Sequence, residues 1–160
     1  MTTIVSRLPI VFAVLAFAAP ACAQGPALPT GELMVASGGP TNVSFVATDF
    51  KRDGEVIEAV GMDVHEPGME VSGDRAVKTT WRRRVDCKAG TYQDLGTSAY
   101  NAAGKVILTL PQEPARPTAE GGQAILGQIV CGGMRAPPEY IAVGDQAAEA
   151  LARKLLASRR

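Results

Sequence analysis

The sequence is poor in the residue types on which most catalytic and cofactor sites depend. Aromatic residues make up 5% of the 160 residues, and the chain has one histidine, one tryptophan and three cysteines. A Ser-His-Asp or Cys-His site would have to use His65, and the chain has no Gly-x-Ser-x-Gly element. No glycine-rich loop leads into a helix with a lysine, as a phosphate-binding site would require. We therefore expect a non-enzymatic protein with no bound cofactor or metal.

The chain also lacks an excess of charge of either sign. It has 16 basic and 16 acidic residues, and all the acids but only 15 of the bases follow residue 23. The part of the chain after that residue therefore has a net charge of about −1. Bulk nucleic-acid binding needs a strongly basic face, so we do not expect a nucleic-acid partner.

Only the first residues contain a long apolar run. Arg7 precedes the apolar stretch 8–19, and Ala21-Cys22-Ala23 supplies small residues at the end. This pattern predicts a secretory signal, residues 1–23, cleaved before Gln24. The apolar run is shorter than the roughly 20 residues of a membrane-spanning helix. Lipidation of Cys22 is a second alternative, but the leucine usual three residues before such a cysteine is absent.

An exported chain without this signal would lie in the periplasm or at the cell surface. It would keep two cysteines, Cys87 and Cys131, and no further stretch able to span a bilayer. In an oxidising compartment such a pair favours a disulfide. Closing a loop of this length would stabilise the fold by about 4 kcal/mol. Two free buried thiols, or a metal site, are the alternatives; the distant single histidine argues against the metal.

Turn signals divide the remaining chain into short segments. Alternating apolar residues predict strands, and an apolar period near 3.6 predicts helices. We expect a flexible leader at 24–32 and a loop at 66–74. The expected strands are 41–50, 55–65, 75–87, 91–100 and 105–110, and the expected helices are 123–131 and 145–157, with Asp145 as N-cap. Short turns between consecutive strands favour an antiparallel meander. The prediction is an α+β fold with a meander of about five to six strands, one helix joined to it by the disulfide, and a C-terminal helix.

The disulfide would also set the phase of the strand 75–87. If Cys87 faces the helix, period-2 alternation places Val85, Arg83 and Trp81 on the same face, and Arg82 and Arg84 on the other. Trp81 would then be in the core. An arginine on that face must be paired, lie at the rim or reach to solvent, and it could also line a binding groove; we favour the rim for Arg83.

A candidate binding surface follows from the same alternation. Tyr92 and Tyr100 have the same parity, which places them on one face of their strand. With Arg82 and Arg84 they would form a small patch able to recognise an envelope protein or a polyanion. The alternative is an ordinary solvated strand face.

Several short segments resemble the bacterial surface-adhesin protein E family. They are Val-Asp-Cys-Lys-Ala-Gly-Thr-Tyr at 85–92, Tyr-Asn-Ala-Ala-Gly-Lys-Val at 100–106, the proline-rich stretch that follows, and Ile-Val-Cys at 129–131. The segment from Phe45 through the turn at 52–54 to Val56 fits the first strands of that family. The resemblance covers roughly residues 33–132.

This resemblance implies an antiparallel sheet of about six strands with a helix tied to it by one disulfide. It implies an adhesin-like domain at 33–136, and the expected helical extension at 137–160 is a departure from the short core of that family. It also implies export, and for the named adhesin it implies binding of host matrix proteins and haem. No binding motif matches position by position, so no contact residue follows from it.

We therefore expect an exported binding or interaction module of the cell envelope. A first alternative is a small-molecule carrier, for example for haem, with His65 as a possible ligand and the groove between helix and sheet as its site. A second is a small hydrolase in which His65 meets Ser44, Ser72 or Ser98. A purely structural envelope protein is the third.

Overall fold

A computed structural model describes residues 25–118 and 123–159. The predicted signal at 1–23, its cleavage site before Gln24 and the alternative lipidation site Cys22 lie outside the described residues. The elements in chain order are β1 (Glu32–Gly38), β2 (Asn42–Ala47), β3 (Lys51–Asp53), β4 (Val56–Val71), β5 (Asp74–Asp86), β6 (Thr91–Tyr100), β7 (Val106–Leu110), β8 (Arg116–Pro117), α1 (Gln123–Gly132), the 3-10 turn η1 (Pro138–Tyr140), β9 (Ile141–Val143) and α2 (Asp145–Ala157).

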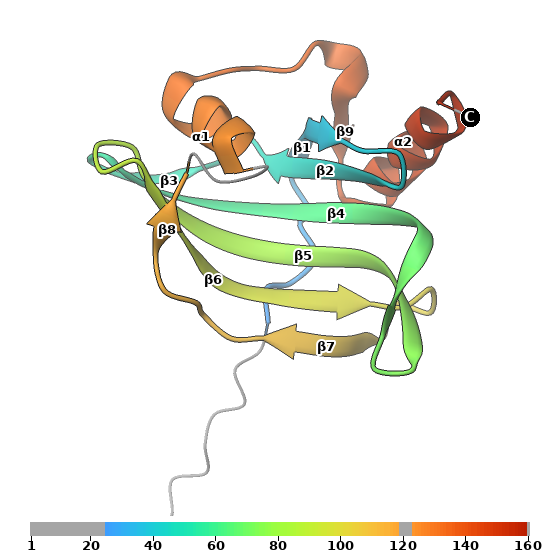
Figure 1. Cartoon of the computed structure of the whole chain (residues 1–160). Helices are drawn as coiled ribbons and strands as arrows, with labels where there is room; N and C mark the ends of the chain where they lie inside the picture. Colours follow the sequence, from blue (N-terminus) through green and yellow to red (C-terminus); the bar gives the residue numbers. More distant parts are fainter. Residues whose placement is uncertain (1–24, 119–122, 160) are drawn as a thin grey trace, which may run out of the picture.

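The strands form one antiparallel sheet in the order β7-β6-β5-β4-β2-β1-β9 (Figure 1). β3 pairs with β4, and β8 pairs with β6. The mainly antiparallel α+β class is confirmed, as are the two helices. The prediction of a five-to-six-strand meander is wrong, because the described sheet has nine strands.

The additional strands were missed for identifiable reasons. β1 is apolar on consecutive positions, with Leu33 and Met34 both buried, because helices cover both faces of the sheet there. Such a run has no period of two. β9 is three residues long and is defined by its pairing with β1, in which Leu33 lies opposite Ala142.

The segment 66–74 is also not the loop that its glycines and proline suggest. β4 continues to Val71 and pairs with β5, with Met69 opposite Ala76. The chain turns at Ser72 and Gly73, both with positive φ. The register shifts between Val64 and Met69, where Pro67 cannot donate to the ladder.

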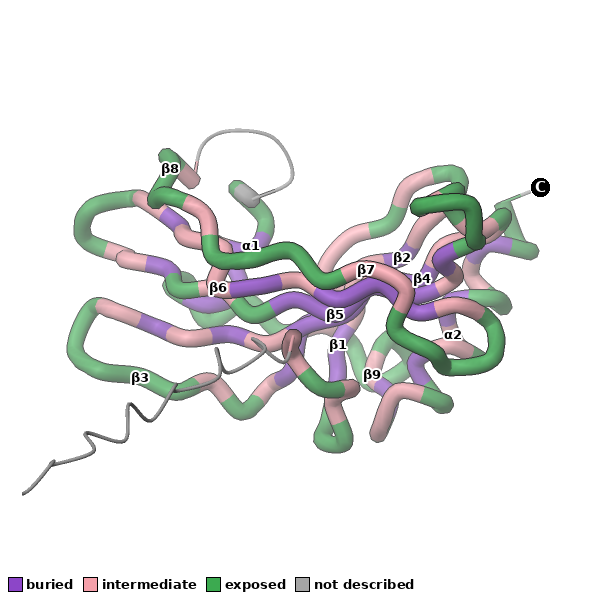
Figure 2. Tube along the Cα trace, turned by 90° about the horizontal axis from the view of Figure 1, so that it is seen from below, coloured by how far each residue is buried: buried purple, intermediate pink, exposed green. Residues whose placement is uncertain are grey.

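The two helices lie on opposite faces of the sheet (Figure 1). On the front face, α1 contributes Leu126, Ile129 and Val130 to a core that includes Trp81 and Val85. On the rear face, α2 contributes Ala148, Ala152 and Leu156 to a core built on residues of β1, β2 and β4. The buried positions follow the middle of the sheet, and the hairpin ends are exposed (Figure 2).

A disulfide between Cys87 and Cys131 joins the end of β5 to the last turn of α1, with 5.6 Å between the two Cα atoms. This confirms the predicted pairing. It also confirms the predicted phase of β5, because Trp81 and Val85 pack against α1.

Residues 137–159 contribute to the main core. Leu156 is 1% exposed, and β9 extends the sheet beyond β1. Gly144, with positive φ, is the N-cap of α2, and the predicted N-cap Asp145 is the first helical residue. The Asp145 carboxylate accepts a hydrogen bond from Lys78 on β5 instead, at 3.3 Å.

The segment 25–31 crosses the rear face of the sheet (Figure 1). The carbonyl oxygen of Pro26 accepts hydrogen bonds from the hydroxyls of Thr80 (2.7 Å) and Tyr100 (3.0 Å), both of which belong to buried residues. Glu32, the last residue of the predicted flexible leader, belongs to β1.

Candidate functional site on the front face of the sheet

A cavity of about 230 Å³ lies between α1 and the front face of the sheet. Four strands and one helix contribute to it, and its lining residues are Ala36, Ser37, Asn42, Ser44, Asp63, Trp81, Arg83, Ile125 and Leu126. The wall from α1 is apolar, whereas the sheet contributes two charged groups, two hydroxyls and an amide. Among the described elements, α1 is the helix that lies over the front face (Figure 1).

Trp81 is central to this site. Its position on β5 is opposite Gly61 on β4, and the six-membered ring lies directly against that glycine. The residue is 3% exposed, and its Nε1 has no hydrogen-bond partner among the described residues. Buried N–H groups are nearly always paired in folded proteins, so an unpaired donor on a residue that lines the cavity is an exception that needs a reason.

Arg83 covers the indole of Trp81. Its guanidinium carbon lies 4.4 Å from the ring centroid, within cation–π distance. Its Nε donates to Asp94 at 2.6 Å, and this bond uses one of the five guanidinium donors. The side chain remains 19% exposed. Arg83 is therefore paired and also lines the cavity, which are two of the possibilities expected for it.

A bulge in β6 makes this ion pair possible. Arg82 lies opposite Gly96 and Arg83 lies opposite Asp94, so Leu95 is the additional residue. The insertion shifts the alternation of β6 by one position. Asp94 consequently shares the front face with Arg83.

Asp63 provides the second charge of the cavity and ends a short chain of hydrogen bonds. The hydroxyl of Thr79 donates to Asp63 at 3.1 Å, and Thr79 Oγ1 lies 3.3 Å from Nε2 of His65. Burial lowers the pKa of His65 below its ordinary value of 6.5, and nearby Asp63 opposes this shift only partly. His65 is therefore neutral near pH 7. Asp63 takes part in none of the ion pairs found among the described residues.

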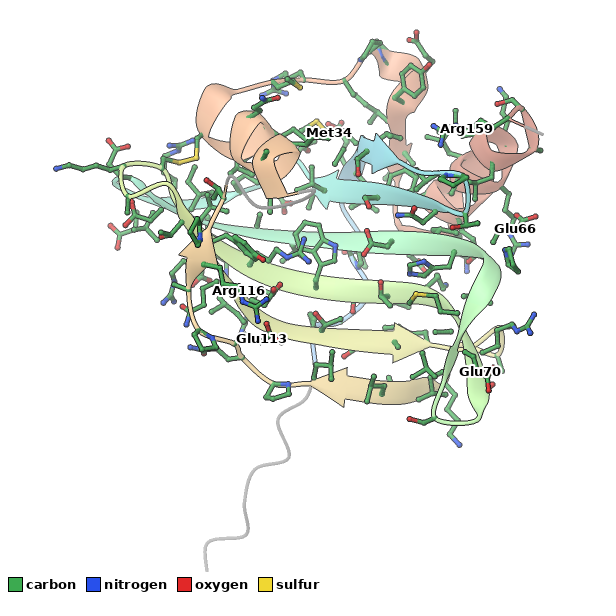
Figure 3. The ribbon with its side chains drawn as sticks, viewed as in Figure 1. Met34, Glu66, Glu70, Glu113, Arg116 and Arg159 are labelled. Atoms are coloured by element: carbon green, nitrogen blue, oxygen red, sulfur yellow. A yellow bond between two sulfur atoms is a disulfide. The ribbon has the colours of Figure 1, made fainter. Side chains whose placement is uncertain are left out.

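A second arginine–carboxylate pair stands at the far side of the same face. Arg116 on β8 lies opposite Tyr92, which faces α1, and its Nη2 donates to Glu113 at 2.7 Å. Figure 3 shows both side chains in front of the sheet, just below α1 in this view. This pair is more exposed than the pair of Arg83 with Asp94.

The structure does not bring the four predicted surface residues together. Arg82 and Arg84 lie on the rear face, and Arg84 is paired with Glu58 at 2.7 Å. The prediction that Tyr92 and Tyr100 share a face is wrong, because the bulge at Leu95 lies between them. Tyr92 packs in the front core, whereas Tyr100 bonds to Pro26 behind the sheet, and both are buried.

The residues that a haem-carrier site or a hydrolase site would need are also separated in the structure. His65 bonds to Thr79, whereas Ser98 lies opposite Thr80 on the rear face and Ser72 lies in the β4–β5 turn. Ser44 lies on the front face opposite Asp63, two positions along the ladder from His65. His65 is not among the residues lining the front cavity, whose volume is far smaller than a haem requires.

Sequence reasoning placed a groove between helix and sheet only as the site of a carrier that uses His65, and it did not identify the residues that line the front cavity. Asp63 and Ser44 are unremarkable along the chain and become neighbours only through the pairing of β2 with β4. One usable signal was present: a glycine inside a strand often marks a bulge, and Gly96, with φ 143°, stands beside Leu95.

Comparison of the chain with protein-family models, with curated proteins and with solved structures finds no match. The resemblance to the surface-adhesin protein E family stays a prediction. Within residues 25–118 and 123–159, no group of three or more histidine, cysteine or acidic side chains is placed to hold a metal ion. None of the helices in the described ranges has the length and apolar character needed to cross a bilayer.

Proposed function

We propose that the chain is an exported, non-enzymatic binding module whose ligand occupies the front cavity beside Trp81. The observation that carries the proposal is the cavity under α1, which is lined by Trp81, a residue whose buried indole N–H has no partner among the described residues. Leaving a buried donor unpaired costs about 1–3 kcal/mol, and a bound acceptor would remove that cost. The disulfide supports the export part of the proposal, because such bonds persist in oxidising compartments.

The front cavity is a better candidate than the arginines of the rear face. Arg84 is already neutralised by Glu58, and the segment 25–31 covers part of the rear face. The front cavity combines an apolar wall with a few convergent polar groups, which is the usual composition of a small-molecule site. A haem carrier using His65 is less favoured, because His65 does not line this cavity.

Trp81 is the only tryptophan, so its indole N–H gives a single, already assigned signal in a ¹H–¹⁵N spectrum. The test adds the low-molecular-mass fraction of an extract of the producing cells to the mature chain. We expect a saturable shift of that signal. No shift at any concentration of the extract would contradict the proposal.

A matched pair of variants locates the binding site. Ala36→Met places a long side chain in the cavity, whereas Ala103→Met changes an exposed residue in the β6–β7 turn. The extract should shift the indole signal of Ala103→Met as in the wild type and should not shift that of Ala36→Met. Equal shifts in both variants would place the ligand elsewhere.

A further inference from the structure

We infer that the ligand of the front cavity is a small zwitterion, an amino acid with an apolar side chain, whose carboxylate pairs with Arg83 and whose ammonium pairs with Asp63. This inference rests on the proposed function and specifies the ligand for that site. It follows from which charges line the cavity, how each is paired, and how much room they enclose.

The two charges that line the cavity have opposite sign and do not pair with each other. Arg83 bonds to Asp94 through Nε, which leaves guanidinium donors for a second carboxylate. Asp63 accepts a hydrogen bond from a neutral hydroxyl, and its carboxylate has no cation in an ion pair among the described residues. A ligand with both an anionic and a cationic group would give Arg83 and Asp63 each a partner of opposite charge.

Ligands of a single charge suit the site less well. Arg83, Asp94 and Asp63 together carry a net charge of about −1 while His65 is neutral, so a simple anion would meet a net repulsion. A simple cation would pair with Asp63 and leave the remaining Arg83 donors without an acceptor. A zwitterion has no net charge and supplies both partners.

The remaining lining of the cavity suits an apolar side chain. Ile125 and Leu126 of α1 form one wall, and Ala36 lies on β1. Pockets for drug-sized ligands measure about 300–1,000 Å³, and the front cavity, at about 230 Å³, lies below that range. A free amino acid such as leucine therefore suits this cavity better than a peptide of several residues.

The closing experiment compares three ligands that differ by one charge each, using calorimetry on the wild-type mature chain. Leucine carries both charges, leucinamide lacks the carboxylate, and 4-methylpentanoate lacks the ammonium group. We expect leucine to bind, and each analogue to bind at least about tenfold more weakly, because each loses one charge-assisted hydrogen bond. Either analogue binding as tightly as leucine would overturn the inference.

Two variants assign each charge to its partner. Asp63→Asn keeps an acceptor for Thr79 and should remove the preference for leucine over 4-methylpentanoate. Arg83→Gln should remove the preference for leucine over leucinamide. Asp49→Asn and Arg82→Gln, which change residues lining a rear cavity, should keep both preferences. Unchanged preferences in folded Asp63→Asn or Arg83→Gln would overturn the assignment.

Failure of this inference can be told apart from failure of the proposed function. If leucine does not bind while the cell extract still shifts the Trp81 signal, the ligand class is wrong and the site stands. If neither produces a response, both proposals are wrong. The ligand analogues need no substitution, so the comparison holds even where a variant does not fold.

Discussion

Gly61 determines where the tryptophan of the front cavity can lie. A Cβ added at Gly61 would collide with the ring of Trp81 and with the backbone carbonyl of Phe45. The indole therefore rests on bare backbone, which holds it flat against β4. The absence of a side chain at Gly61 therefore helps to set the shape of the front cavity.

We predict that Gly61→Ala destabilises the fold by about 2–3 kcal/mol, because overpacking a filled core forces side chains and backbone to move. Gly127→Ala is the matched control. Gly127 lies inside α1 and its Cβ would meet only Thr118, at 3.9 Å. It should stabilise the chain by up to about 1 kcal/mol, since alanine is the better helix former. Urea unfolding measures both, and equal stabilities would contradict the packing described at Gly61.

His65 makes stability depend on pH. Burial lowers its pKa in the folded state, and Asp63 opposes the shift only in part. The unfolded chain therefore binds a proton more readily than the folded one, so folding stability should fall as the pH drops below the ordinary value of 6.5. His65→Gln should flatten the stability profile just below pH 6.5. An unchanged slope in that variant would show that His65 is not the titrating group.

At the scale of elements, a buried lysine connects α2 to the sheet. Lys78 on β5 is 8% exposed, and its ammonium lies 3.3 Å from Asp145 and 3.1 Å from Glu149, both on α2. Burial alone would raise the pKa of Glu149, but hydrogen bonds from Arg153 and Lys78 outweigh burial and lower it below 4.5. The lysine thus helps to hold the Glu149 carboxylate in its charged form and also forms an ion pair with Asp145.

We predict that Lys78→Met destabilises the fold by about 1–3 kcal/mol at neutral pH, because both carboxylates lose their shared cation. Lys105→Met, at an exposed position, should have almost no effect. Because the pKa of Glu149 is lowered in the folded state, its contribution is present above pH 4.5 and is lost as the pH falls further. Thermal unfolding across this range checks both points; a neutral effect of Lys78→Met would contradict the role given to the lysine.

Element types were more predictable than element contacts. The periods of 2 and 3.6 located β6 and both helices closely, because each has its own apolar pattern. β9 has three residues and depends on β1 as a partner, so a pattern cannot reveal it. The same limit explains the candidate site. The bulge at Leu95 reversed the face of Tyr100, and the cavity beside Trp81 requires four strands and α1 in their final places.

At the scale of the molecule, the sheet lies between two helices, and different interactions attach each helix to it. The disulfide ties α1 to the front, whereas the Lys78 ion pairs and a buried apolar face hold α2 at the rear. Just after α2, Arg159 donates to the carbonyl of Gly39 in the β1–β2 turn, at 2.7 Å (Figure 3). The front cavity depends on α1, so its shape should depend on the disulfide.

We predict that the double substitution Cys87→Ser, Cys131→Ser lowers the free energy of unfolding by about 4 kcal/mol, because the unfolded chain regains the freedom of a long loop. Loss of the bond should also weaken the response of Trp81 to ligand, since Leu126 and Ile125 lose their covalent tether. Denaturant unfolding and the indole signal measure the two effects. A stability unchanged by the substitutions would contradict the structural role of the bond.

The binding site beside Trp81 is tested most directly by finding the segments in which a bound ligand slows backbone hydrogen exchange. Backbone hydrogen exchange of the mature chain, with and without the low-molecular-mass cell extract, reports this for every segment. We predict slower exchange in the peptides that carry the cavity, from β1, β2, β4, β5 and α1, with the segment 25–31 and β7 unchanged. Protection confined to the rear segment or to β7, or no protection anywhere, would contradict a binding site beside Trp81.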